Sequence, residues 1–200
     1  MTGPDARALL AAAPGRAGAP SSDYDLNKEL VLPENRVLRP AGVLIGIIDR
    51  NGRAELVLTK RSSRLKHHPG QIALPGGKVE DIDDGPVDAA LREAEEEVGL
   101  PHEAVEVLGT LPAHETVTGF SVTPVLGWIR DAFTPVPEVG EVDEIFYAPL
   151  GFVLDPANFV VESRHWRRQR RYYYAVPWGP HYIWGATARI LRGLADRVAP

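Results

Sequence analysis

The stretch Gly70–Leu100, GQIALPGGKVEDIDDGPVDAALREAEEEVGL, determines the fold and the site expected for this chain of 200 residues. It combines a glycine-rich turn, a short acidic loop and a segment crowded with glutamates that ends at Gly99. The apolar residues of the second half recur at spacings of three and four: Val87, Ala90, Leu91, Ala94 and Val98. This period predicts an amphipathic helix with one face in the core, and Gly99 is a good C-terminal stop.

The glutamates of this helix form a cluster. Glu93, Glu96 and Glu97 are expected on the side opposite the apolar face, because residues three and four apart share a helix face. A solvated acidic face is one interpretation. The alternative is a magnesium site, since Mg²⁺ typically takes one or two carboxylates together with water and substrate phosphates. Arg92, immediately before Glu93, can orient or partly neutralise the cluster.

The order of these residues resembles the signature of the Nudix hydrolase family, G-x5-E-x7-R-E-U-x-E-E-x-G-U, in which U is apolar. From Arg92 to Leu100 the chain matches every specified position. The first half departs from the signature: the residue eight before Arg92 is Asp84 rather than glutamate, and the loop after Gly77 is one residue longer. The resemblance implies an α/β fold, namely an α/β/α sandwich with a mixed β-sheet between helices.

The resemblance also implies roles for individual residues. Glu93 and Glu97 would be the principal ligands of Mg²⁺ or Mn²⁺, with Glu96 as a third or bridging ligand. The backbone carbonyl of Gly77 would add a further oxygen, and Arg92 would orient the cluster. The implied reaction is metal-dependent hydrolysis of a pyrophosphate bond in a small molecule.

A basic tract, KRSSRLKHHPGQ from Lys60 to Gln71, precedes the glycine turn. Such a tract can be a solvated loop, or it can bind phosphate, because arginine forks match phosphate oxygens. We expect Arg61, Arg64 and His68 to contact the anionic groups of the substrate, together with Gly76, which leaves the backbone open to a ligand. A joint metal site of His67 and His68 is disfavoured, because adjacent residues on a strand point to opposite sides.

Four further stretches resemble the coenzyme A diphosphatase branch of the family: LTKRSS (58–63), GQIALPGG (70–77), VTGFSVTPV (117–125) and YIWGATA (182–188). Such enzymes split coenzyme A into 3′,5′-ADP and 4′-phosphopantetheine, and the basic tract would then bind the 3′-phosphate. The alternatives are a Nudix hydrolase of ADP-ribose or nucleoside triphosphates, and a non-catalytic domain that binds a nucleotide or a protein. The non-catalytic alternative would be expected to have lost one or more of the glutamates.

An acidic loop, DAFTPVPEVGEVDE, spans residues 131–144. Glu141, Asp143 and Glu144 are candidates for a further metal ligand or for a catalytic base. Among them Glu141 is the one that we expect to act. Loop carboxylates are often merely solvated, and that alternative stays open for Asp143 and Glu144.

The rest of the chain alternates between strand and helix patterns. Asn51-Gly52 is a strong hairpin signal between two apolar runs. The expected strands are 41–49, 53–59, 71–74, 105–111, 120–129 and 145–150, followed by a hairpin of 158–162 with 171–176. A loop is expected at 112–119, and an amphipathic helix closes the chain at 186–198. Residues 40–200 are thus expected to form the catalytic domain.

Residues 1–39 are expected to be an N-terminal extension that is partly flexible. Asp5 could cap a short helix through Ala13, stopped by Pro14 and Gly15. A linker rich in glycine, alanine, proline and serine follows. The stretch 26–32 could then pack across the surface of the domain.

Composition limits the partners and the compartment. The net charge of −5 argues against a general nucleic-acid binder, and the lack of cysteine excludes disulfides and thiolate metal sites. The tract RHWRRQRR (164–171) beside tyrosines could bind single-stranded nucleic acid, but alternation of Tyr172, Tyr174 and Val176 favours a strand with the arginines in its preceding turn. No run approaches the length of a membrane-spanning helix. We expect a cytoplasmic monomer or homodimer without a nucleic-acid or membrane partner.

Overall fold

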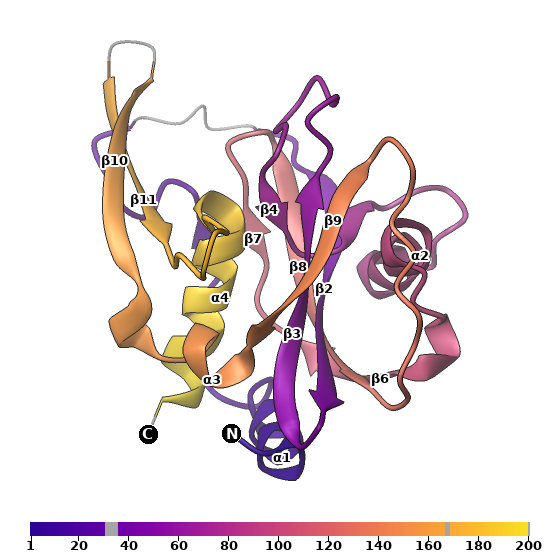
Figure 1. Ribbon diagram of the computed structural model, residues 1–200. Coiled ribbons are helices and arrows are strands. Elements are labelled where there is room, and N and C mark those ends of the chain that lie inside the picture. The colour runs from indigo at the N-terminus through magenta and orange to yellow at the C-terminus, as the bar shows by residue number, and fades with distance from the viewer. Residues whose placement is uncertain (31–35, 167–168, 200) are drawn as a thin grey trace.

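The computed structural model describes residues 1–30, 36–166 and 169–199 (Figure 1). Its helices are α1 (Gly3–Ala12), α2 (Pro86–Val98), α3 (Leu150–Val153) and α4 (Gly185–Val198), with short 3₁₀ turns at His102–Ala104 and Pro156–Asn158. Its strands are β1 (Ser21–Ser22), β2 (Arg39–Arg50), β3 (Arg53–Arg61), β4 (Ile72–Ala73), β5 (Gly76–Lys78), β6 (Val105–Thr110), β7 (His114–Glu115), β8 (Phe120–Ile129), β9 (Val142–Pro149), β10 (Val160–Trp166) and β11 (Gln169–Ala175).

Strands β1 to β9 join in one mixed sheet. Its main path runs β1-β7-β8-β2-β3-β4, while β5 pairs with β2, β6 with β8 and β9 with β3. The long central pair β2–β8 is parallel, and β2–β3 is an antiparallel hairpin. Its turn has positive φ at both Asn51 and Gly52, as the sequence predicts. The sheet therefore brings the ends of β3, β4 and β9 together beside β5.

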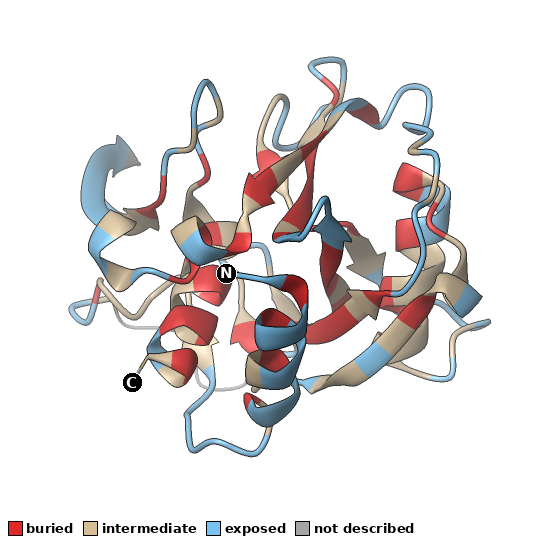
Figure 2. Ribbon diagram, turned by 60° about the horizontal axis from the view of Figure 1, so that its bottom comes forward, coloured by how far each residue is buried: buried red, intermediate tan, exposed pale blue. Residues whose placement is uncertain are grey.

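Two cores lie on opposite faces of this sheet. On one face α2 covers a cluster that includes Val57, Ala94 and Val98. On the other face α4 and α1 cover a larger cluster that includes Leu10 and Leu191. Figure 1 shows α2 and α4 on the two sides of the sheet, and in Figure 2 the helices beside the labelled termini carry both buried and exposed residues. This is the α/β/α sandwich that the resemblance to the Nudix family implies.

The start of the chain differs from the prediction. Thr2, not Asp5, is the N-cap of α1, and Asp5 lies in its first turn, where its carboxylate accepts a hydrogen bond from the Thr2 hydroxyl. The helix begins earlier because a proline, Pro4, fits the first turn of a helix without losing a hydrogen bond. The helix ends at Ala12, with Ala13 as its C-cap.

The loop expected at 112–119 contains a short strand. His114–Glu115 (β7) pairs with β8 and also with Ser21–Ser22 (β1). The fully buried imidazole of His114 holds this arrangement, with Nδ1 3.0 Å from the Ser21 hydroxyl and Nε2 3.2 Å from a carboxylate oxygen of Asp23. A contact across more than 90 residues leaves no local pattern in the sequence, so the strand was not predicted.

The hairpin near the C-terminus forms, but its strands are longer than expected. Arg164 of β10 lies opposite Arg171 of β11 in the ladder, so these arginines belong to the strands and not to the turn. Residues 167–168 of the tract, and 31–32 of the stretch expected to pack across the surface, lie outside the described residues. The side chain of Asn27 bonds both backbone groups of Tyr172, at 2.9 Å each.

The acidic loop is also shorter than expected. Strand β9 begins at Val142, so Asp143 and Glu144 lie in a strand that pairs with the end of β3. None of the helices in the described ranges is long and apolar enough to span a bilayer.

Candidate active site

The glycine turn and the glutamate helix meet at the edge of the sheet. Strand β5 pairs with β2 so that Gly77 lies opposite Gly42. A Cβ atom on Gly77 would lie 2.2 Å from a carboxylate oxygen of Glu93, so glycine is required for the carboxylate to rest on the backbone. Gly76 has φ of 154°, and a Cβ there would lie 2.3 Å from the carbonyl oxygen of Gly42. Gly77 thus leaves the space in which the Glu93 carboxylate lies, and Gly76 allows the turn to pack closely against β2.

Glu97 is buried, although the helix period places it with Glu93 and Glu96 on the side of α2 opposite the apolar face. The alternative of a solvated acidic face therefore does not describe Glu97. Glu97 is only 3% exposed, whereas the side chain of Glu96 is 51% exposed. The backbone N–H of Gly76 donates to Glu97 Oε2 at 3.3 Å, and Arg61 Nη1 lies 3.8 Å from Oε1. The carboxylate is buried because the turn at Gly76 and the end of β3 cover this part of α2.

Burial changes the ionisation of both inner glutamates. Desolvation raises the pKa of Glu97 to about 8, against the opposing effects of the Gly76 N–H and Arg61. Desolvation also raises the pKa of Glu93, and Arg92 opposes that shift. The charge of Glu93 also disfavours the ionised form of Glu97, and the charge of Glu96 does the same to Glu93, as like charges in one site do. The positive charges near Glu93 and Glu97 therefore do not fully compensate the two carboxylates.

Glu141 approaches this pair from the opposite loop. Its negative charge is among the causes that raise the pKa values of Glu93 and Glu97, which places its carboxylate within electrostatic range of both. The residue is exposed, and its backbone carbonyl accepts from Ser62 N–H at 2.7 Å. Asp143 instead accepts from Ser63 N–H at 2.8 Å, which lowers the pKa of Asp143.

Arg92 holds the outer side of the cluster. Its guanidinium donates to Glu93 at 3.1 Å and to Glu96 at 2.9 Å, and it reaches the backbone carbonyl of Lys78 at 3.4 Å. Its shortest contact is with Asp83, at 2.8 Å from Nε and 3.1 Å from Nη2. This bidentate pair lowers the pKa of Asp83 and raises that of Arg92.

Asp83 was missed by counting back from Arg92, which gives Asp84. Asp84 is exposed, and its backbone N–H, not its carboxylate, is engaged, with Asp88. Counting forward from Gly77 with the spacing G-x5-E gives Asp83. The extra residue therefore lies after the first acidic position, between Asp83 and the helix.

Asp83→Asn should lower the stability of the folded protein, and Asp84→Asn should not. Loss of the charged partner of Arg92 is expected to lower the free energy of unfolding by about 1–3 kcal/mol. The exposed Asp84 carboxylate should change it by less than about 0.5 kcal/mol. Urea denaturation of the two variants checks this, and equal midpoints would contradict the assignment of Asp83 as the partner of Arg92.

The basic tract reaches the cluster through its first arginine. Arg61 lies at the end of β3 and contacts Glu97, whereas Arg64 and His68 are exposed on the loop of residues 62–70. Neither of these two side chains pairs with a glutamate of α2 in the described structure. The loop is closed at its base, because Arg61 N–H bonds Gln71 and Gly70 N–H bonds Arg61.

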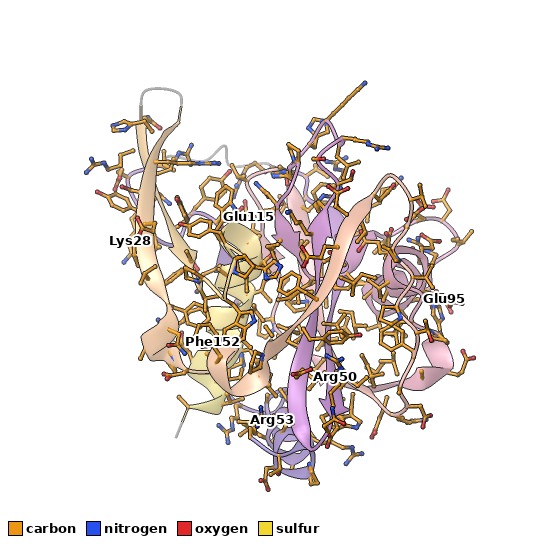
Figure 3. All side chains as sticks on the ribbon, in the orientation of Figure 1. Lys28, Arg50, Arg53, Glu95, Glu115 and Phe152 are labelled. Carbon is orange, nitrogen blue, oxygen red and sulfur yellow. The ribbon has the colours of Figure 1, made fainter. Side chains whose placement is uncertain are left out.

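The residues of this cluster fit a hard divalent cation. No group of three histidine, aspartate or glutamate side chains in the described ranges is arranged to hold a metal by itself. Magnesium does not need one, since it is usually bound by one or two carboxylates plus water and substrate phosphates. Glu93 and Glu97 supply carboxylate oxygens beside the glycine backbone, and their mutual repulsion is the condition that a cation would relieve. Figure 3 shows Glu95 on the outer side of α2.

Comparison with known proteins gives the same family. Residues 38–173 match the model of the NUDIX domain. The chain is 43% identical over 161 residues to an uncharacterized Nudix hydrolase, NudL, of Cronobacter sakazakii, covering 80% of this chain and 83% of that protein. Over 178 residues it is 42% identical to NudL of Citrobacter koseri, covering 88% of this chain and 92% of that protein.

A solved structure agrees at the level of the fold. The crystal structure of a MutT/nudix family protein from Enterococcus faecalis superposes with a TM-score of 0.50 at 16% identity, covering 86% of this chain and 66% of that one. Members of this family use divalent metal ions and act on small molecules. With its domain match, its relatives and this fold, the chain belongs to the Nudix hydrolase family.

Proposed function

We propose that this enzyme hydrolyses the pyrophosphate bond of coenzyme A or its derivatives, giving 3′,5′-ADP and 4′-phosphopantetheine, with Mg²⁺ or Mn²⁺. The observation that carries the proposal is the contact between Arg61 and Glu97. It joins a basic tract to the carboxylate cluster, so the Arg61 guanidinium lies beside the place where a diphosphate would be held. A substrate with an extra phosphate monoester makes use of such a tract.

In this proposal Glu93 and Glu97 hold the cation, with Glu96 and the Gly77 carbonyl as further oxygens. Bound there, a divalent ion would supply positive charge to the phosphate oxygens and lower the pKa of a water molecule. Arg92 orients Glu93 and Glu96 through the contacts described above, with Asp83 fixing its guanidinium. Positioning and charge stabilisation supply most of the catalysis in phosphoryl transfer.

Glu141 is the proposed base. Water attacks one phosphorus of the diphosphate, the bond from that phosphorus to the bridging oxygen breaks, and the second phosphate leaves with that oxygen. The Glu141 carboxylate accepts the proton of the water; it is exposed and within electrostatic range of Glu93 and Glu97. The anionic groups of the substrate are bound by Arg61, Arg64 and His68. Gly76, whose N–H donates to Glu97, has no side chain and so leaves room for the substrate beside the turn.

Purified enzyme should convert coenzyme A into 3′,5′-ADP and 4′-phosphopantetheine when Mg²⁺ or Mn²⁺ is present. The basic tract should favour coenzyme A over dephospho-coenzyme A, because only the former carries the 3′-phosphate. Chromatography of the products with both substrates, with ADP-ribose and with a nucleoside triphosphate checks this. Intact coenzyme A beside cleaved ADP-ribose or triphosphate would replace the proposed substrate, and no turnover of any of them would favour a binding domain.

A further inference from the structure

A second group of ionisable side chains lies at the same end of the sheet, on its other face. Lys60 of β3 is paired with Glu144 of β9 and with Ile72 of β4, and directly opposed residues share a face. Ile72 belongs to the core covered by α4. Arg61, the next residue of β3, reaches the other face and contacts Glu97 of α2. Consecutive residues at the end of β3 thus lie on opposite faces of the sheet.

His181 holds Glu144 in place. Its Nε2 lies 3.0 Å from Glu144 Oε1, and its ring is stacked on Phe146 at 3.6 Å and 4°. The turn that carries it is closed by two backbone hydrogen bonds between Trp178 and His181. The imidazole is 13% exposed, and its Nδ1 is buried without a partner in the described structure. Nε2–H therefore donates to Glu144, and the stacked ring fixes the direction of that bond.

The charged groups of Lys60 and Glu144 do not neutralise each other in an ion pair. Lys60 and Glu144 are opposite charges in directly opposed positions, yet no ion pair within 4.0 Å joins them in the described ranges. The Glu144 side chain is 44% exposed, and His181 contacts only one of its two carboxylate oxygens. A cationic donor and an anionic acceptor are thus held side by side by the strand register.

The position of this pair relates it to the carboxylate cluster. Glu144 is three residues beyond Glu141, and Lys60 is adjacent to Arg61. A diphosphate held by Arg61 and the α2 glutamates carries two bulky substituents. A substituent that passes over the end of β3 and β9 would meet Lys60 and Glu144, which lie at that end of the two strands.

We propose that Lys60 and Glu144, positioned by His181, form a specificity subsite for a neutral polar group on one half of the substrate. Lys60 donates to a carbonyl or ring-nitrogen acceptor of that group, and Glu144 accepts from one of its N–H groups. Coenzyme A has two groups of this chemistry, the amides of the pantetheine arm and the edge of the adenine ring. The inference rests on the proposed function, because it assigns part of the same substrate.

Inhibition by the two products tests the subsite and identifies its occupant. The variants are Lys60→Met and Glu144→Gln, with Glu103→Gln, an exposed residue of a 3₁₀ turn, as the matched control. We expect the inhibition constant of one product to rise about tenfold in both variants, the loss of one charged hydrogen bond. The constant of the other product should stay unchanged. A rise for 4′-phosphopantetheine assigns the pantetheine amides, and a rise for 3′,5′-ADP assigns adenine.

His181→Phe separates positioning from folding, because phenylalanine keeps the stack on Phe146 and loses the bond to Glu144. It should raise the inhibition constant of the same product as Glu144→Gln does, with kcat and the melting temperature near wild type. Unchanged inhibition constants in all variants of an active enzyme would overturn the subsite alone. Equal losses for both products with a lower melting temperature would also overturn it. Absence of coenzyme A hydrolysis in the wild type would instead remove the proposed function.

Discussion

Glu97→Gln is expected to lower kcat by about 10²–10³-fold or more, with the fold intact. Glutamine has the same shape and can still accept from the Gly76 N–H, so the turn at the glycines should keep its position. What is lost is a negative charge beside Glu93, at the centre of the cluster that would hold the cation. Product formation under saturating Mg²⁺ or Mn²⁺ measures this effect.

Glu95→Gln is the matched control for this variant. It removes one carboxylate from the same helix, but Glu95 is exposed on the outer side of α2, where it pairs with His102 at 3.4 Å. Its activity should stay within about twofold of wild type. Equal activity of the two variants would show that burial beside Gly76 does not distinguish Glu97, and the roles of Glu93 and Glu97 would have to be reassigned.

The second large effect is a loss of stability of the metal-free protein as the pH rises. Glu97 has a pKa of about 8 in the folded chain, above its ordinary value of 4.5. Between these two values the folded state binds a proton that the unfolded state has released, so stability falls with rising pH. The fall is about 1.4 kcal/mol per pH unit within the window, up to about 5 kcal/mol above pH 8. Below pH 4.5 the residue contributes nothing.

Glu97→Gln should therefore be more stable than wild type at pH 8, although it is less active. Urea denaturation of both proteins with a chelator, at pH 5, 6, 7 and 8, measures the difference in free energy of unfolding. That difference should grow along the series and shrink when Mg²⁺ or Mn²⁺ is added, since a bound cation favours the ionised carboxylate. The free energy of unfolding of Glu95→Gln should change with pH in the same way as that of the wild type. Parallel curves for wild type and Glu97→Gln would contradict the raised pKa.

Functional sites commonly contain groups that cost stability, and Glu97 fits that pattern. A buried carboxylate with one backbone donor at 3.3 Å and a guanidinium at 3.8 Å is incompletely compensated. Asp83 is the contrasting case, because its bidentate pair with Arg92 lowers its pKa. The two acids of one motif thus differ: Asp83 forms a compensated ion pair with Arg92, whereas Glu97 is the carboxylate that we propose binds the cation.

Much of the helix and its neighbouring strands followed from local pattern. The apolar period predicts α2 to within one residue of Pro86–Val98, and Gly99 ends it in the left-handed conformation. Asn51-Gly52 and the apolar runs beside it predict the β2–β3 hairpin, and 120–129 is found as β8. These elements obey rules that act over a few residues, which a sequence records directly.

The sequence on its own determined the set of candidate functional residues and their spacing: the glycines, the glutamates three and four residues apart, and the basic tract before them. The tertiary structure alone decided which of these glutamates is buried and which acid pairs with Arg92. It also decided that Lys60 and Glu144 lie opposite each other on neighbouring strands and that His181 contacts Glu144. The physical reason is that spacing fixes the direction of a side chain relative to its own helix or strand. Burial, pKa and partners depend on what another part of the chain places against it.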